Sequence, residues 1–211
     1  MKRITLSALL MTLFLLMSCN NSGTSPKDGQ VAKSDGTIFD LATITKNIKD
    51  TVAFAKDVTE VHTLVKSIDE LAKAIKKKIQ ADGLQDDNDN HNGSLVAGVF
   101  SVVLNIQAKL LALETKTADN ELKKQVTSAK TKSDELVNKL KGQNADLGKA
   151  DGAVSEAHAK EAIKRDNGTK AKGAKELDEL NIAVDALLTA AEDAVTAVIN
   201  ALTTSAKPSN T

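Results

Sequence analysis

The fold class is decided by residues 177–202, which read LDELNIAVDALLTAAEDAVTAVINAL. Apolar residues recur there with a period of about 3.5, the repeat of helices that pack side by side along their length. The members of this seam are Leu177, Leu180, Val184, Leu187, Ala191, Val195, Val198 and Leu202. The stretch predicts a long helix from about Ala171 to Thr204, and its many small residues predict a slender bundle.

A second long helix is predicted near the other end of the chain. Thr37 and Asp40 resemble a capping box in which Asp replaces the usual Glu. The apolar residues that follow are spaced as on one helical face rather than in a strand. They are Leu41, Ile44, Ile48, Val52, Ala55, Val58, Val61, Val65, Ile68, Leu71, Ile75 and Ile79. We expect this helix to stop at Gly83.

Shorter helices are predicted between the two long ones. Their ranges are 94–113, 119–142 and 155–165, with Ser94, Asp119 and Ser155 as N-terminal caps. Pro26 and Pro208 are the only prolines, so no proline interrupts the helical region. The predicted fold is all-α: an elongated antiparallel bundle of about five helices, whose loops 82–93, 142–154 and 166–170 point away from the chain ends.

The first residues have the pattern of an export signal. The basic pair Lys2-Arg3 precedes an apolar run over residues 4–17, and the sequence LMSC occupies residues 16–19. A cysteine directly after such a cleavage site is typical of bacterial lipoproteins, in which it carries the lipid. A transmembrane anchor is the alternative, but a span needs about 20 apolar residues. Cys19 is therefore the predicted lipid attachment site, which holds the protein to a membrane.

These features divide the chain into four parts. We expect a signal peptide over 1–18, a lipidated flexible tether over 19–36, a helical bundle domain over 37–204 and a flexible tail over 205–211. The tether is polar and has no periodic apolar residues, which predicts disorder.

Composition argues against several classes of partner. The chain has 28 basic and 28 acidic residues, and removal of the signal leaves it slightly acidic, so no nucleic-acid partner is expected. Trp and Tyr are absent, which leaves no stacking platform for bases or sugar rings.

No metal, cofactor or catalytic site is predicted. The acidic loop 86–93 resembles part of a calcium loop, but both possible registers fail, one at Val99 and the other at His91. His62, His91 and His158 form no ligand set, and no nucleophile motif or phosphate loop occurs. The chain is therefore expected not to be an enzyme; a periplasm-facing carrier or enzyme is the remaining alternative.

Lysine clusters are the one candidate ligand feature. Lys73, Lys76 and Lys77 are predicted to share a helical face, and a second patch contains Lys160, Lys164 and Arg165. Such residues could contact sulfates of a host glycosaminoglycan, but the favoured interpretation of each cluster is a solvated charged face near helix ends. A further patch is formed by Lys170, Lys172 and Lys175.

Several stretches resemble one family of Borrelia surface lipoproteins, that of outer surface protein C and the variable small proteins. They are TLSALLMTLF (5–14), SCNNSG (18–23), SIDELAKAI (67–75), HNGSLVAG (91–98), DLGK (146–149), AKEAI (159–163) and NGTKAKG (167–173). The chain is more similar to the variable small proteins of relapsing-fever spirochaetes than to outer surface protein C.

The resemblance implies a helical homodimer on the outer face of the outer membrane. It implies an antigen expressed as one of many variants, whose switching evades host antibodies, with possible contacts to host glycosaminoglycans or other host proteins. A role in transmission from tick to mammal is the alternative. Apolar residues beyond one stripe of the first helix, such as Val61 beside Val65 and Ile68, also favour a dimer.

Overall fold

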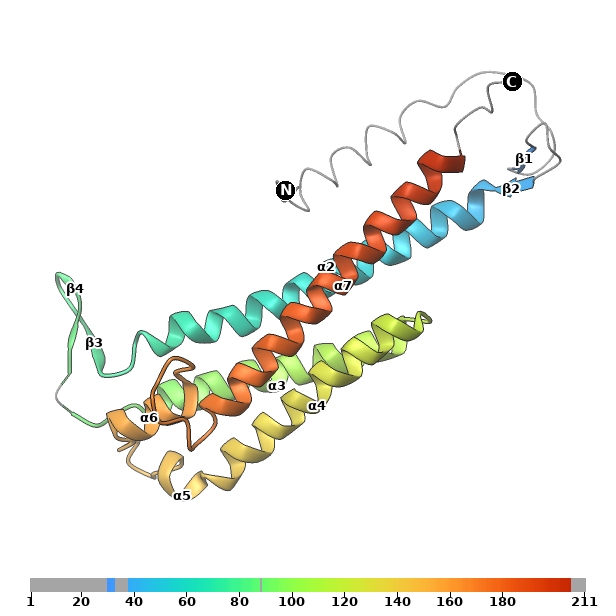
Figure 1. Ribbon diagram of the computed structural model, residues 1–211. Coiled ribbons are helices and arrows are strands. Elements are labelled where there is room, and N and C mark those ends of the chain that lie inside the picture. The colour runs from blue at the N-terminus through green and yellow to red at the C-terminus, as the bar shows by residue number, and fades with distance from the viewer. Residues whose placement is uncertain (1–29, 33–37, 88, 206–211) are drawn as a thin grey trace. The chain divides into compact units, whose positions relative to one another are not determined.

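The computed structural model describes residues 30–32, 38–87 and 89–205 (Figure 1). The chain divides into two units, Met1–Thr45 and Lys46–Thr211. The described residues form the helices α2 (Leu41–Ala72), α3 (Gly93–Lys116), α4 (Asn120–Gly142), α5 (Asn144–Leu147), α6 (Glu156–Ile163) and α7 (Ala174–Ser205). The strands are β1 (Gln30–Ala32), β2 (Ile38–Asp40), β3 (Lys77–Gln80) and β4 (Gly83–Asp86). The predicted all-α class is confirmed.

The first unit contains a short antiparallel hairpin that the sequence analysis did not predict. Strands β1 and β2 pair with Val31 opposite Phe39. The predicted capping box is therefore wrong, because Ile38–Asp40 is a strand and α2 begins only at Leu41. Isoleucine and phenylalanine favour extended backbone, and pairing with β1 outweighs the helical pattern here.

The core of the second unit lies between four long helices. Helix α4 packs against both α3 and α7, and α2 is joined to α3 and α7 by ion pairs along its length. Figure 1 shows α3 and α4 as an antiparallel pair, with the short helices α5 and α6 gathered at one end. Fully buried aliphatic side chains fill the interior, among them Val61, Val65, Ile106 and Leu110.

The predicted seam of the last helix is confirmed along most of its length. Leu177, Leu180, Val184, Leu187, Ala191 and Val195 are all buried. Close approach begins just before α7, at Gly173, whose φ is +149°. A Cβ there would lie 2.8 Å from a methyl carbon of Leu140 and 2.9 Å from the Ala162 carbonyl oxygen. Only glycine fits this junction of α4, α6 and α7.

The first helix is shorter than predicted, because α2 ends at Ala72 and residues 77–86 form the β3–β4 hairpin. The change occurs at Lys76, whose φ is +60°. Its N–H donates to Asn92 Oδ1 (2.8 Å), and its carbonyl accepts from the Asp87 N–H (3.0 Å). These tertiary bonds outweigh the helical spacing of Ile75 and Ile79. Gly83 is the first residue of β4, directly after the hairpin turn and with φ +118°, rather than a helix stop.

Two of the three predicted helix caps are confirmed. Asp119 accepts hydrogen bonds from the N–H groups of Glu121 and Leu122, and Ser155 accepts one from the His158 N–H. Ser94 is not a cap, because α3 begins one residue earlier and its cap residue is Asn92. The loop around Gly152 supplies a carbonyl to the first N–H of α3 instead.

Candidate functional site

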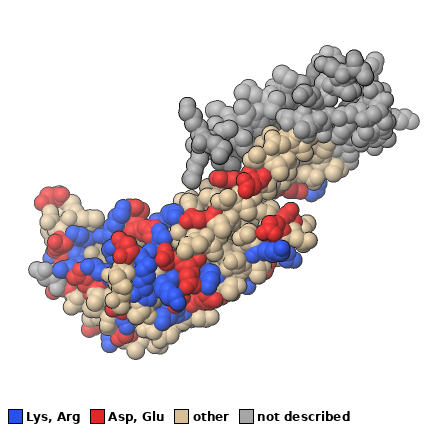
Figure 2. Space-filling model, viewed as in Figure 1, with Lys and Arg blue, Asp and Glu red and all other residues tan. Residues whose placement is uncertain are grey.

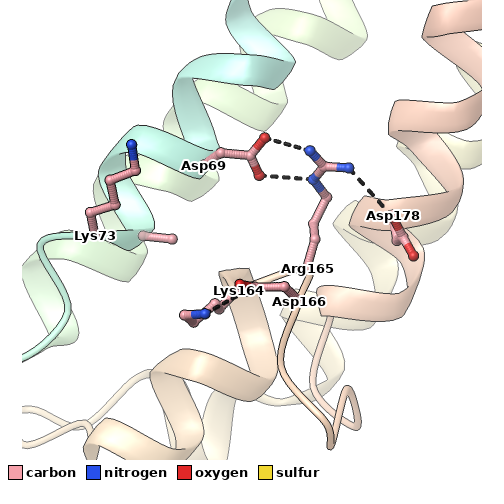
Figure 3. Close-up of a pocket in the computed structure, with 7 residues that line it drawn as sticks. Asp69, Lys73, Lys164, Arg165, Asp166 and Asp178 are labelled. Carbon is pink, nitrogen blue, oxygen red and sulfur yellow. Dashed lines mark hydrogen bonds and ion pairs between the residues drawn. The ribbon is translucent and has the colours of Figure 1, made fainter.

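The best-defined pocket lies where the α6–α7 connection meets α2 and α7. It has a volume of about 390 Å³ and is lined by Asp69, Ala72, Lys73, Lys164, Arg165, Asp166 and Asp178. Figure 3 shows Arg165 between Asp69 and Asp178, with the Lys73 and Lys164 side chains apart from this group. Three basic and three acidic side chains line this pocket, so its charges balance.

Arg165 lines this pocket and is held there by two carboxylates. Its Nε donates to Asp69 Oδ1 (2.8 Å), its Nη2 donates to Asp69 Oδ2, and its Nη1 lies 3.4 Å from Asp178 Oδ1. The side chain is only 20% exposed. Hydrogen bonding to Asp69 is the main cause that raises the pKa of the guanidinium above its usual value. This two-pronged pair ties the loop after α6 to α2 and leaves little of the arginine available to a ligand.

The local sequence explains how the loop presents Arg165. Helix α6 begins at the Ser155 cap and ends at Ile163, and Ala162 and Ile163 are buried. Ile163 is fixed in the core, and a turn at Arg165 and Asp166 follows the end of the helix. Lys170 then pairs with Asp178 on α7 (3.0 Å), which holds the returning chain.

All six cations predicted to contact a polyanion are engaged by carboxylates. The pairs are Lys73 with Glu70, Lys76 with Glu156, Lys77 with Asp86, Lys160 with Glu156, Lys164 with Asp166, and Arg165 with Asp69 and Asp178. The first three residues do not share a helical face, because α2 ends before them. The structure brings Lys73, Lys164 and Arg165 together at one pocket and leaves Lys77 on the hairpin.

Figure 2 shows the surface consequence of this pairing: Lys and Arg side chains alternate with Asp and Glu over the loop end instead of gathering by sign. The third predicted patch follows the same rule. Lys172 pairs with Asp146, Lys175 with Glu179, and Lys170 with Asp178.

Two charged or polar centres were missed by sequence reasoning. The first lies where α4 packs against α7, a contact that we call the α4–α7 seam. There the Lys132 Nζ lies 2.8 Å from Glu179 Oε2 and 2.9 Å from Glu135 Oε2. Hydrogen bonds to Glu135 and then Glu179 raise the pKa of the Lys132 ammonium, and the bond to Lys132 lowers the pKa of Glu179. The i, i+3 spacing of Lys132 and Glu135 was the only available signal.

The second missed centre is Asn92, which is 5% exposed. Its Oδ1 accepts from the Lys76 N–H, and its Nδ2 donates to the Val154 carbonyl (2.9 Å). One amide therefore joins the base of the β3–β4 hairpin, the start of α3 and the loop before α6. The Asn-Gly dipeptide at a helix start was the signal in the sequence.

No arrangement for metal or acid–base chemistry is found in the described part of the chain. No group of three His, Cys, Asp or Glu side chains there could hold a metal ion. The Asp86 and Asp87 carboxylates pair with Lys77 and Lys78, and hydrogen bonds lower the pKa of both groups. His62 lies 3.1 Å from Asp185, and His158 lies 3.8 Å from Asp146.

Cys19 and the predicted signal peptide lie outside the described residues, as do the C-terminal residues from 206 onward. Part of the predicted tether lies outside them too. The lipid attachment site thus remains a sequence prediction.

Comparison with known proteins gives one consistent result. A family model described as "Lipoprotein" (Lipoprotein_6) matches residues 38–208. Variable small protein 11 of Borrelia hermsii is 44% identical over 97% of this chain and 99% of its own length. Outer surface protein C of Borreliella burgdorferi is 44% identical over 96% of this chain and 95% of its own length.

A solved structure agrees with these relatives. Variable small protein 1 of Borrelia turicatae matches with a TM-score of 0.72 and 56% identity, over 77% of this chain and 99% of that structure. The resemblance stated from the sequence is confirmed, and the matching proteins are lipoproteins rather than members of a known enzyme family.

Proposed function

This chain belongs to the lipoprotein family of the variable small proteins and outer surface protein C, and we propose that it serves as an exchangeable surface antigen. Its relatives are outer surface lipoproteins of Borrelia, and the protein lies at the outer surface of the outer membrane as they do. Replacement of one family member by another would then remove the surface that host antibodies recognise.

The observation that supports this proposal is the grouping of loops in the second unit. Asn92 and the Gly93–Gly152 hydrogen bond join the α2–α3 connection to the loop before α6, and Arg165 ties the α6–α7 connection to α2. These loops gather at the end of this unit opposite to the start of its α2 segment and the end of α7 (Figure 1). These gathered loops are the surface that we propose host antibodies recognise.

Selection with antiserum tests the proposal. Serum raised against this chain should kill spirochaetes that express it, and the survivors should express a different family member. Survivors that still carry this chain unchanged, at the same amount on the surface, would contradict exchange as its function. Replacing Cys19 by Ser should release the chain from the membrane fraction, which tests the anchor separately.

We also propose that the protein is a homodimer, but the apolar residues of the first helix that suggested a dimer from the sequence are not the interface. Val61, Val65 and Ile68 are fully buried within one chain and cannot form an interface. The outer face of α3 offers one instead: Leu104 is 40% exposed and Leu111 is 53% exposed. No charged residue occurs between Gly93 and Ala108.

Helix α3 is long and apolar enough to cross a membrane by length and composition alone. Its buried residues belong to the bundle core, however, and a core helix with a second, dimer-facing side has the same composition. Light scattering on the unlipidated protein at micromolar concentration should show a dimer, and Leu104→Lys should shift it toward monomer. A wild-type monomer would overturn this proposal.

Contact with a sulfated glycosaminoglycan is a second candidate function. The pair between Lys73 and Glu70 is about 70% exposed on both sides, and such exposed pairs are weak enough for a sulfate to displace the carboxylate. Lys73→Ala should weaken salt-sensitive binding to heparin. Lys46→Ala is the matched control, because Lys46 pairs with Asp50 at similar exposure but away from the pocket. Equal binding by both variants and wild type would exclude the Lys73 site.

A further inference from the structure

The chain contains the dipeptide Asn-Gly at two places, Asn92-Gly93 and Asn167-Gly168. Asn-Gly is the sequence most prone to spontaneous deamidation, because glycine has no side chain to hinder its own backbone nitrogen. Whether the reaction proceeds in a folded protein depends on the freedom of that nitrogen and of the asparagine amide. The structure places these two dipeptides in opposite environments.

The first dipeptide is held in place. Asn92 is 5% exposed, and both ends of its amide are used, by the Lys76 N–H and by the Val154 carbonyl. The Gly93 N–H donates to the Gly152 carbonyl (3.1 Å) and begins α3. Attack by this nitrogen would require the hairpin base and the helix start to open together.

The second dipeptide is less constrained than the first. It lies in the α6–α7 connection, where Gly168 is exposed and a Cβ built on it meets no atom within 4 Å. Within the described residues the Gly168 N–H donates no hydrogen bond. The side-chain amide of Asn167 donates to the Thr169 carbonyl, a local bond within the same exposed loop, whereas the Asn92 amide is tied to two other segments.

We propose that Asn167 is a site of spontaneous deamidation, with water as the co-reactant, and that Asn92 is protected from it. The deprotonated Gly168 nitrogen attacks Cγ of Asn167, the Cγ–Nδ2 bond breaks, and ammonia leaves with the displaced proton. The resulting succinimide is then hydrolysed by water. Cleavage of its bond to Cγ gives aspartate, and cleavage of its bond to the main-chain carbonyl carbon gives isoaspartate; no oxidant or reductant is needed.

The product changes the surface beside the pocket. A new carboxylate appears next to Asp166, which pairs with Lys164, and isoaspartate adds one methylene to the loop that carries Arg165. This consequence rests on the proposed function: on a displayed antigen, one gene product would present two chemical forms of the same exposed loop.

The experiment is peptide mapping of the purified full chain by mass spectrometry during storage in mildly alkaline buffer. Deamidation is detected as the mass difference between an amide and a carboxylic acid. The peptide with Asn167 should acquire this mass at least about tenfold faster than the peptide with Asn92, because Asn92 reacts only after local opening. An isoaspartyl methyltransferase should label the same peptide. In concentrated urea the two rates should become similar, because both segments then have the same freedom.

Two results would overturn the proposal: no conversion of Asn167 while the urea sample converts, or equal rates of the two sites in folded protein. Gly168→Ala is the matched variant, because the added methyl has room but hinders the nitrogen, and it should slow conversion of Asn167 severalfold. An unchanged rate would exclude the succinimide route. None of these readouts depends on serum selection, so failure here leaves the antigen proposal intact, and the reverse also holds.

Discussion

The α4–α7 seam buries large aliphatic side chains, whereas the β3–β4 hairpin exposes side chains of similar size. On the seam, Leu180 and Leu187 are fully buried, and Gly173, just before α7, leaves room for the Leu140 side chain of α4. On the hairpin, Ile79 is 86% exposed and its cross-strand partner Leu84 is 60% exposed. The seam therefore carries folding free energy, whereas the hairpin is held mainly at its base. Substitutions in the hairpin are therefore expected to leave the bundle intact.

The largest expected difference between the two regions comes from replacing one leucine by alanine in each of them. Leu187→Ala should lower the free energy of unfolding by about 2–5 kcal/mol, since it removes a fully buried side chain and leaves a cavity. Leu84→Ala should change it by less than about 0.5 kcal/mol. Urea unfolding monitored by circular dichroism measures both. A large loss for Leu84→Ala would show that the hairpin belongs to the cooperative core.

Arg165 belongs to neither of these regions, because it joins the α6–α7 connection to α2. Arg165→Ala should lower the free energy of unfolding by about 1–3 kcal/mol, since partly buried Asp69 loses a two-pronged charged partner. Lys46→Ala, which breaks an exposed pair with Asp50, should have an effect of less than about 1 kcal/mol. Equal effects of the two substitutions would mean that the Arg165 pair acts as an ordinary surface pair.

Sequence reasoning predicted the seam well and the loop end poorly, for a physical reason. Long-range periodicity is a summed signal, so the spacing from Leu177 to Val195 specified α7 and its buried face. The end of α2 depends instead on a few tertiary hydrogen bonds, made by Lys76 with Asn92 and Asp87. The lysine residues whose charge suggested a ligand site form ion pairs with carboxylates instead. Partners that are distant in sequence, such as Asp69 and Arg165, leave no local pattern by which the pair could be predicted.

A smaller effect is expected inside the seam at Ser133. Its hydroxyl is fully buried and has no hydrogen-bond partner, so it loses its hydration without compensation. Ser133→Ala should raise the free energy of unfolding by up to about 1 kcal/mol. Ser67→Ala is the control, because the Ser67 hydroxyl donates to the Leu64 carbonyl (2.7 Å), and it should give no gain. Destabilisation by Ser133→Ala would contradict the assignment of that hydroxyl as unsatisfied.

The smallest expected effect is a difference in pH dependence between the two regions. Glu179 on the seam and Asp86 on the hairpin both have a lowered pKa, caused mainly by hydrogen bonds from Lys132 and Lys77. A carboxyl whose pKa is lower in the folded state adds stability above its unfolded pKa of about 4, and that stability disappears as the pH falls through the folded pKa.

These two carboxyl groups should nevertheless affect global unfolding differently. Glu179→Gln should reduce the loss of unfolding free energy between about pH 6 and pH 3, because its partner lies on another core helix. Asp86→Asn should leave that loss unchanged, because Asp86 and Lys77 belong to one hairpin that can open while the bundle stays folded. Urea midpoints across this pH range measure both variants, and high salt should weaken the Glu179 effect. If Asp86→Asn flattened the pH profile as much as Glu179→Gln, opening of the hairpin would be coupled to global unfolding, and the separation between a stable seam and a replaceable hairpin would fail.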